Sequence, residues 1–99
     1  MFIYSGMPDT DRSRALAALR FRALGDETRL RLLEILSDRE HTVADLMAAT
    51  GLGQSLVSHH LRALRDAALV TTRRDGRWIH YALSRPAVAT TRLVLYELD

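Results

Sequence analysis

The sequence contains no cysteine, no lysine and no long apolar run. Without cysteine, the chain can form no disulfide, thiolate metal site or cysteine redox switch. No apolar stretch approaches the roughly 20 residues that a membrane span needs, and the opening Met1–Tyr4 is too short for a signal-peptide core. We therefore expect a cytoplasmic protein.

Signatures of catalysis are missing as well. The chain has no cysteine nucleophile, no glycine-rich phosphate loop and no HExxH helix of the metalloprotease type. Ser58 and His59 are neighbours in sequence only, which does not arrange a nucleophile and its base. We predict that the protein is not an enzyme and needs no cofactor.

The basic charge is unevenly distributed. All 14 basic side chains are arginine, which is typical of a GC-rich genome but also suits bidentate contacts to phosphate and guanine. Residues 26–53 carry three arginines against six carboxylates, whereas residues 54–85 carry six against two. A protein with one phosphate-facing surface should show such an asymmetry.

Length limits the chain to one domain. Ninety-nine residues bury only roughly two-thirds of the surface that the unfolded chain exposes, so a dimer would supply missing core. Residues 1–8 lack periodicity and end in Pro8, which predicts an N-terminal arm. Residues 9–99 are expected to form the folded domain.

Two kinds of apolar spacing divide that domain. Three- and four-residue spacing, with capping residues at Asp26, Thr42 and Ser84, is typical of amphipathic helices. Alternation after Ala68, with Asp75-Gly76 as a turn signal, predicts a two-stranded hairpin. The expected order is ααααββα, mainly α with a small β-hairpin, with helices near 9–24, 27–36, 43–50, 54–67 and 87–98 and the hairpin over 69–83.

The third and fourth helices, joined by a short glycine-containing turn, have the helix-turn-helix layout. The hairpin that follows has an arginine-rich tip, and together these elements predict a winged helix-turn-helix fold. We expect the second helix to bury Leu30, Leu33, Ile35 and Leu36, and the fourth to bury Leu56, Val57, His60 or Leu61, and Leu64.

The outer face of helix 54–67 and the hairpin tip carry side chains that can reach base edges or phosphates. Ser55 could instead be only a helix cap, and the tip could be only a solvated charged turn. Trp78 is expected to pack against the helix rather than stack on a base. The predicted DNA contacts are Gln54, Ser55, Ser58, His59 and Arg62 on the helix and Arg73, Arg74 and Arg77 on the wing.

Four segments together resemble the ArsR/SmtB family of bacterial repressors. They are Ala23–Leu33 (ALGDETRLRLL), Val43–Leu46 (VADL), Gly53–Leu64 (GQSLVSHHLRAL) and Arg74–Tyr81 (RDGRWIHY). The resemblance implies a homodimeric DNA-binding repressor whose first and last helices form the dimer interface. A twofold pair favours a near-palindromic operator. The apolar residues predicted for that interface are Leu16, Leu19, Val88, Leu95 and Leu98.

The resemblance also implies where metal ligands would lie, and this chain departs from it. The family's cysteine pair falls on Thr42 and Ala44, and residues 86–99 contain no histidine for the family's other site. His60 is predicted to point inward with a structural role. We therefore expect no metal site of the family's kind, and an effector that is non-metal or unknown.

Two alternatives remain open from the residues. Three- and four-residue spacings could gather an atypical metal site, although solvated helix ends explain the same side chains. The fold could also serve as a winged-helix protein-interaction module without sequence-specific DNA binding. The residues of the atypical site would be Glu34, Asp38, His41 and Asp45.

Overall fold

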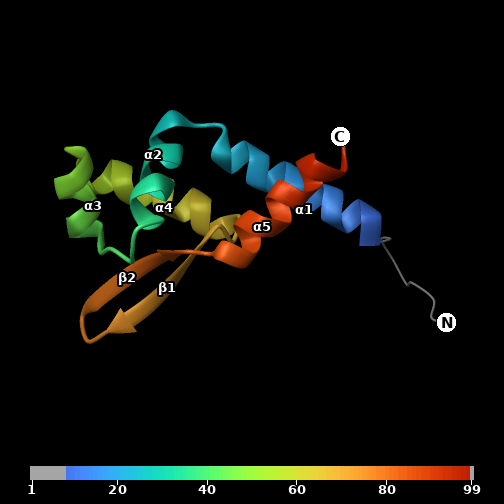
Figure 1. Ribbon diagram of the computed structural model, residues 1–99. Helices are drawn as coiled ribbons and strands as arrows, with labels where there is room; N and C mark the ends of the chain where they lie inside the picture. The colour runs from blue at the N-terminus through green and yellow to red at the C-terminus, as the bar shows by residue number, and fades with distance from the viewer. Residues whose placement is uncertain (1–8, 99) are drawn as a thin grey trace.

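The computed structural model describes residues 9–98, so the predicted arm over 1–8 lies outside the described residues. Five helices and one hairpin follow the predicted order ααααββα (Figure 1). Among the described residues, no helix is long and apolar enough to cross a membrane. The elements are α1 (Asp9–Leu24), α2 (Glu27–Leu36), α3 (Val43–Thr50), α4 (Gln54–Asp66), β1 (Val70–Asp75), β2 (Trp78–Leu83) and α5 (Arg85–Glu97).

The predicted capping residues start three of these helices. The Asp26 carboxylate accepts the Arg29 backbone N–H at 3.0 Å, and this bond holds the Asp26 pKa below its ordinary value. Thr42 and Asp45 form a reciprocal capping box, in which the Thr42 backbone N–H likewise lowers the Asp45 pKa. Ser84 Oγ accepts the Ala87 N–H at 3.3 Å. The helix starts are therefore set by local side-chain chemistry.

The core gathers around α4 and consists mainly of leucine. Its fully buried members include Leu32, Leu36, Leu46, Leu61, Leu64 and Leu69. Two predictions were wrong, because Leu30 is 47% exposed and Leu56 is 44% exposed. Leu30 lies two residues before Leu32, almost on the opposite side of α2. Leu56 lies one position before the buried Val57, in the first turn of α4.

The hairpin register differs from the predicted turn by one residue. Asp75 pairs with Trp78, so the two-residue loop is Gly76-Arg77 rather than Asp75-Gly76. Gly76 has φ of 62°, the left-handed conformation that such a loop requires and that glycine adopts without steric cost. The hairpin is fixed to the helices by two backbone bonds between His41 and Tyr81, at 2.9 and 2.8 Å.

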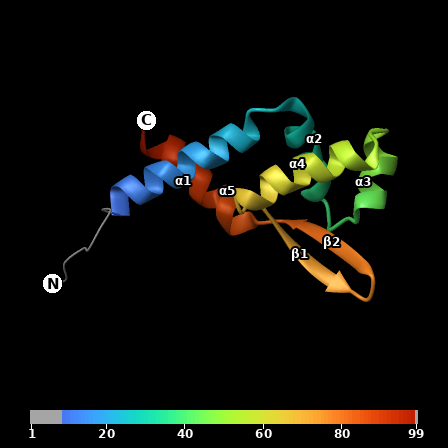
Figure 2. The same ribbon diagram turned by 180° about the vertical axis from the view of Figure 1, so that it is seen from behind.

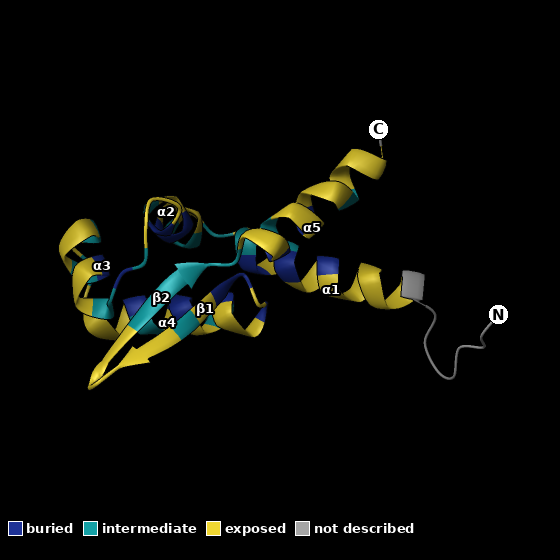
Figure 3. Ribbon diagram, turned by 60° about the horizontal axis from the view of Figure 1, so that its bottom comes forward, coloured by how far each residue is buried: buried dark blue, intermediate teal, exposed yellow. Residues whose placement is uncertain are grey.

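Helices α1 and α5 lie at one end of the molecule, with α3 and the hairpin tip at the other (Figures 1 and 2). The molecule is accordingly elongated, at 50 × 32 × 22 Å. Exposed residues cover much of the outer surface of α1 and α5 (Figure 3). Large apolar side chains among them are Leu16, Leu19, Leu93, Leu95, Tyr96 and Leu98.

Four arginines cap the C-terminal ends of helices other than their own. A cation at this end interacts favourably with the carbonyls that have no partner within the helix. The C-terminal ends of α1, α2, α3 and α4 each receive one such arginine from another helix. These contacts therefore stabilise the packing of the helices against one another. The bonds are Arg29 to Ala23 O of α1 at 3.4 Å, Arg85 to Ser37 O after α2 at 2.8 Å, Arg31 to Ala49 O of α3 at 3.3 Å, and Arg20 to Ala67 O after α4 at 3.0 Å.

Candidate nucleic-acid interface

Helix α4 begins after a tight glycine turn. Gly51 ends α3 in the left-handed conformation, with φ of 77°, and Gly53 is the N-cap of α4 with no side-chain cap bond. Ser55 therefore does not cap the helix, and its exposed side chain stands in the first turn. The structure removes the cap as an explanation for Ser55.

The two faces of α4 differ sharply. Val57, His60, Leu61 and Leu64 are buried and hold the helix against the core. The five predicted contact residues lie on the other side, where Ser58 is half-buried and the other four are exposed. This arrangement presents a row of hydrogen-bonding side chains on a helix that the core holds in place.

His60 is buried, as predicted, and it is held by α2. Arg29 Nε donates to His60 Nδ1 at 3.1 Å, and the Asp26 carboxylate lies 3.8 Å from the same ring nitrogen. His60 thus joins α4 to the start of α2.

The three arginines of the wing are not equivalent. Arg73 forms an ion pair with Glu40, in the connection between α2 and α3, and His80 Nδ1 lies 3.7 Å from the same carboxylate. The Arg73 hydrogen bond lowers the Glu40 pKa and raises the Arg73 pKa. This pair is therefore fully formed above the ordinary carboxyl pKa and is lost as the pH falls through the lowered one.

The other two wing arginines remain at the tip. Arg74 bonds to the Gly76 carbonyl at 3.3 Å, and the Arg77 guanidinium lies 5.2 Å from the centre of the Trp78 ring. Trp78 is 51% exposed, so about half of its side chain faces solvent. The tip therefore offers two cations and an aromatic surface to solvent.

A groove of about 360 Å³ separates the wing from α3 and the start of α4. Its lining residues include Gln54 of α4, Trp78 of the wing and Thr42, the N-cap of α3. Sequence reasoning placed Trp78 beside helix 54–67 but did not assign Thr42 to this surface. The alternation of Trp78 with Ile79 gave a signal for Trp78 only.

The atypical metal site predicted as an alternative is not assembled. Within residues 9–98, no group of three or more histidine or carboxylate side chains is close enough to hold a metal ion. His41 is buried between the helices and the hairpin, while the Asp45 carboxylate is engaged in its capping box. The four candidate residues thus do not converge.

Comparison with known proteins identifies the family. Residues 26–72 match the model described as "Bacterial regulatory protein, arsR family". The transcriptional repressor SmtB homolog of Synechocystis is 45% identical over 74 residues, covering 75% of this chain and 55% of that protein. The transcriptional activator HlyU of Vibrio cholerae is 33% identical over 92 residues, covering 93% of this chain and 85% of that protein. The chain belongs to the arsR family.

Solved structures of this arsR family share the fold. One is the homodimeric winged helix-turn-helix DNA-binding domain of a possible regulator from Mycobacterium bovis, with a TM-score of 0.77 and 26% identity over 98% of this chain and 91% of that one. The chain spans little more than half the length of the first curated relatives that it matches. These relatives are regulators rather than enzymes, in agreement with the prediction from the sequence.

Proposed function

We propose that this arsR-family chain is a sequence-specific DNA-binding transcriptional regulator, acting in the cytoplasm as a repressor. The observation that carries the proposal is the exposed polar face of α4 beside the arginine-bearing wing. Such a helix fits the major groove, and a hairpin tip can follow the backbone or enter the minor groove. Among its relatives, the repressors support repression, whereas HlyU is an activator.

The proposed contacts follow the two surfaces. Gln54, Ser55, Ser58, His59 and Arg62 would read base edges and adjacent phosphates from α4, while Arg74 and Arg77 would contact the backbone from the wing. Arg73 belongs to this set once DNA phosphate displaces Glu40 from it. Arg62 makes no hydrogen bond or ion pair with any other residue in the described part of the chain, so its guanidinium is available for the groove.

A homodimer would present two copies of α4 to successive major grooves, roughly 34 to 36 Å apart. Leu16, Leu19, Leu95 and Leu98 are exposed on α1 and α5, and Val88 is partly covered. Covering these apolar side chains favours association. We expect sedimentation to show a dimer at micromolar concentration, and a monomer alone would contradict this part of the proposal.

Substituting Arg62 with alanine should weaken binding to the protein's own promoter DNA roughly 5- to 150-fold, the range for losing one bidentate base contact. Arg74→Ala should instead weaken binding to all sequences and flatten the salt dependence by about one phosphate contact. Fluorescence anisotropy with promoter and scrambled DNA across a salt series measures both. Equal, weak binding of the unmodified protein to both DNAs would favour a winged-helix protein-interaction module instead.

Glu40→Gln should release Arg73 and tighten binding to any duplex DNA. Because one more arginine then reaches phosphate, the slope of log affinity against log salt should steepen by about 0.9. Glu34→Gln makes the same charge change at an exposed position of α2 and serves as the matched control. Identical slopes for the two variants would show that Glu40 does not restrain Arg73.

A further inference from the structure

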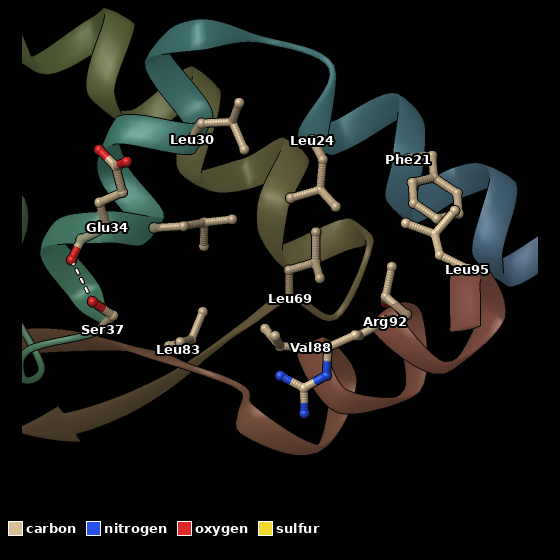
Figure 4. Close-up of a pocket in the computed structure, with 12 residues that line it drawn as sticks. Phe21, Leu24, Leu30, Glu34, Ser37, Leu69, Leu83, Val88, Arg92 and Leu95 are labelled. Carbon is tan, nitrogen blue, oxygen red and sulfur yellow. Dashed lines mark hydrogen bonds between the residues drawn. The ribbon is translucent and has the colours of Figure 1, made fainter. Parts of the chain in front are cut away.

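We propose that the groove between α1, α2 and α5 binds a small monocarboxylic acid with an apolar body. This groove has a volume of about 480 Å³, within the usual range for small-molecule sites. Leu24, Leu30, Leu69, Leu83 and Val88 converge on it from different elements (Figure 4). An apolar ligand of modest size would cover these side chains.

The charged side chains at the rim of the groove indicate which polar group the ligand carries. Arg92 lines the groove beside Val88, and its guanidinium has no hydrogen bond or ion pair with residues 9–98. Glu34 stands at the far edge, with its carboxylate turned outward (Figure 4). A carboxylate would pair with Arg92, whereas a second carboxylate at the other end would approach the like charge of Glu34 at the rim. The rim therefore favours a monoacid over a diacid.

Position links this groove to the rest of the molecule. Leu69 lies three residues after the end of α4, and its carbonyl accepts the Ser84 N–H at 2.9 Å where the hairpin meets α5. Phe21 and Leu95 bring α1 and α5 to the same groove. A bound acid would touch the two proposed dimer helices and the base of the wing together. Its effect on DNA affinity rests on the proposed function, but its binding does not.

A second copy of the chain is the competing occupant. Of the five residues predicted for the dimer interface, only Val88 and Leu95 line this groove, while Leu16, Leu19 and Leu98 lie outside it. The unpartnered Arg92 guanidinium can pair with the carboxylate of an acid, whereas an apolar helix face offers it no partner. The observations therefore favour the acid.

Isothermal titration calorimetry without DNA tests the site, with decanoate as probe and decanol and decanedioate as controls. We expect decanoate to bind at one site per protomer, more tightly than either control. Arg92→Gln should weaken decanoate at least about tenfold and leave decanol unchanged, which a loss of folding would not do. Arg22→Gln, an exposed arginine of α1 that does not line the groove, should change neither.

Three results would overturn the proposal: no binding of decanoate, equal affinity for decanoate and decanol, or equal affinity in the Arg92→Gln variant. Leu30→Asp, followed by sedimentation, identifies the competing occupant. A change from dimer to monomer would assign the groove to the second copy, whereas a persistent dimer with weakened decanoate binding supports the acid. Promoter binding is measured in a separate experiment. A failure to recognise DNA would therefore not affect the result for decanoate binding.

Discussion

Replacing Leu61 with alanine should lower the free energy of unfolding by about 2 to 5 kcal/mol, the range for truncating a buried leucine. Leu61 is 1% exposed and lies in the middle of the buried face of α4. The lost side chain would leave a cavity between the helix and the core, where the close-packed neighbours relax only partly. This is the largest stability change that we expect in α4.

Leu56 gives the matched control in the same helix. It is 44% exposed, so Leu56→Ala should change the free energy of unfolding by under about 0.5 kcal/mol. Urea denaturation followed by circular dichroism measures both variants, with the slope of the transition checked for two-state behaviour. Equal losses at the two positions would mean that the Leu56 side chain contributes as much buried contact as Leu61, contrary to its exposure.

The contrast between these leucines shows what periodicity can and cannot predict. Apolar spacing and capping residues identified all five helices, because these signals act within a few residues of one another. The same spacing placed both Leu56 and Leu61 in the core. Whether an apolar residue at the edge of the helix face is buried depends on the elements that pack against it. These elements are distant in sequence, so the local apolar spacing does not identify them.

The prediction of a phosphate-facing surface from the charge distribution was also only partly informative. The excess of arginine over residues 54–85 indicated a phosphate-facing surface, and five of its six arginines do lie on α4 or the wing. Arg73 pairs with Glu40, and Arg85 caps α2 instead. Both partners lie more than 30 residues earlier in the chain. A local charge count cannot detect such pairs, so it overestimates the free cations of the surface.

Several arginines of the chain have a structural role. Arg20, Arg29, Arg31 and Arg85 each donate to a carbonyl at the end of another helix. The planar guanidinium offers several donors in a fixed geometry, which a lysine ammonium does not. These contacts were not predicted from the sequence, because nothing local distinguishes them from the solvated arginines around them.

Arg20→Ala should therefore lower the free energy of unfolding by about 2 to 3 kcal/mol, through loss of a charged hydrogen bond and of the packing of its aliphatic stem. Arg20 is 8% exposed, and its Nε bonds to Ala67 O directly after α4. The next residue, Ala68, has φ of 57°, and the Leu69 N–H reaches back to Leu64 O at 2.9 Å. Arg20 thus adds a bond from α1 to a helix end whose backbone is already strained.

Two further variants separate the contributions. Arg20→Met retains most of the stem and should lose less stability than Arg20→Ala, while Arg22→Ala, on an exposed face of the same helix, should lose little. Urea denaturation ranks the three. If Arg20→Met were as stable as the unmodified protein, the bond to Ala67 would contribute nothing net, because the cost of burying the guanidinium would cancel it. If both Arg20 variants lost stability while Arg22→Ala did not, the contact from α1 would be shown to stabilise the C-terminal end of α4. This is the helix that we propose enters the DNA groove.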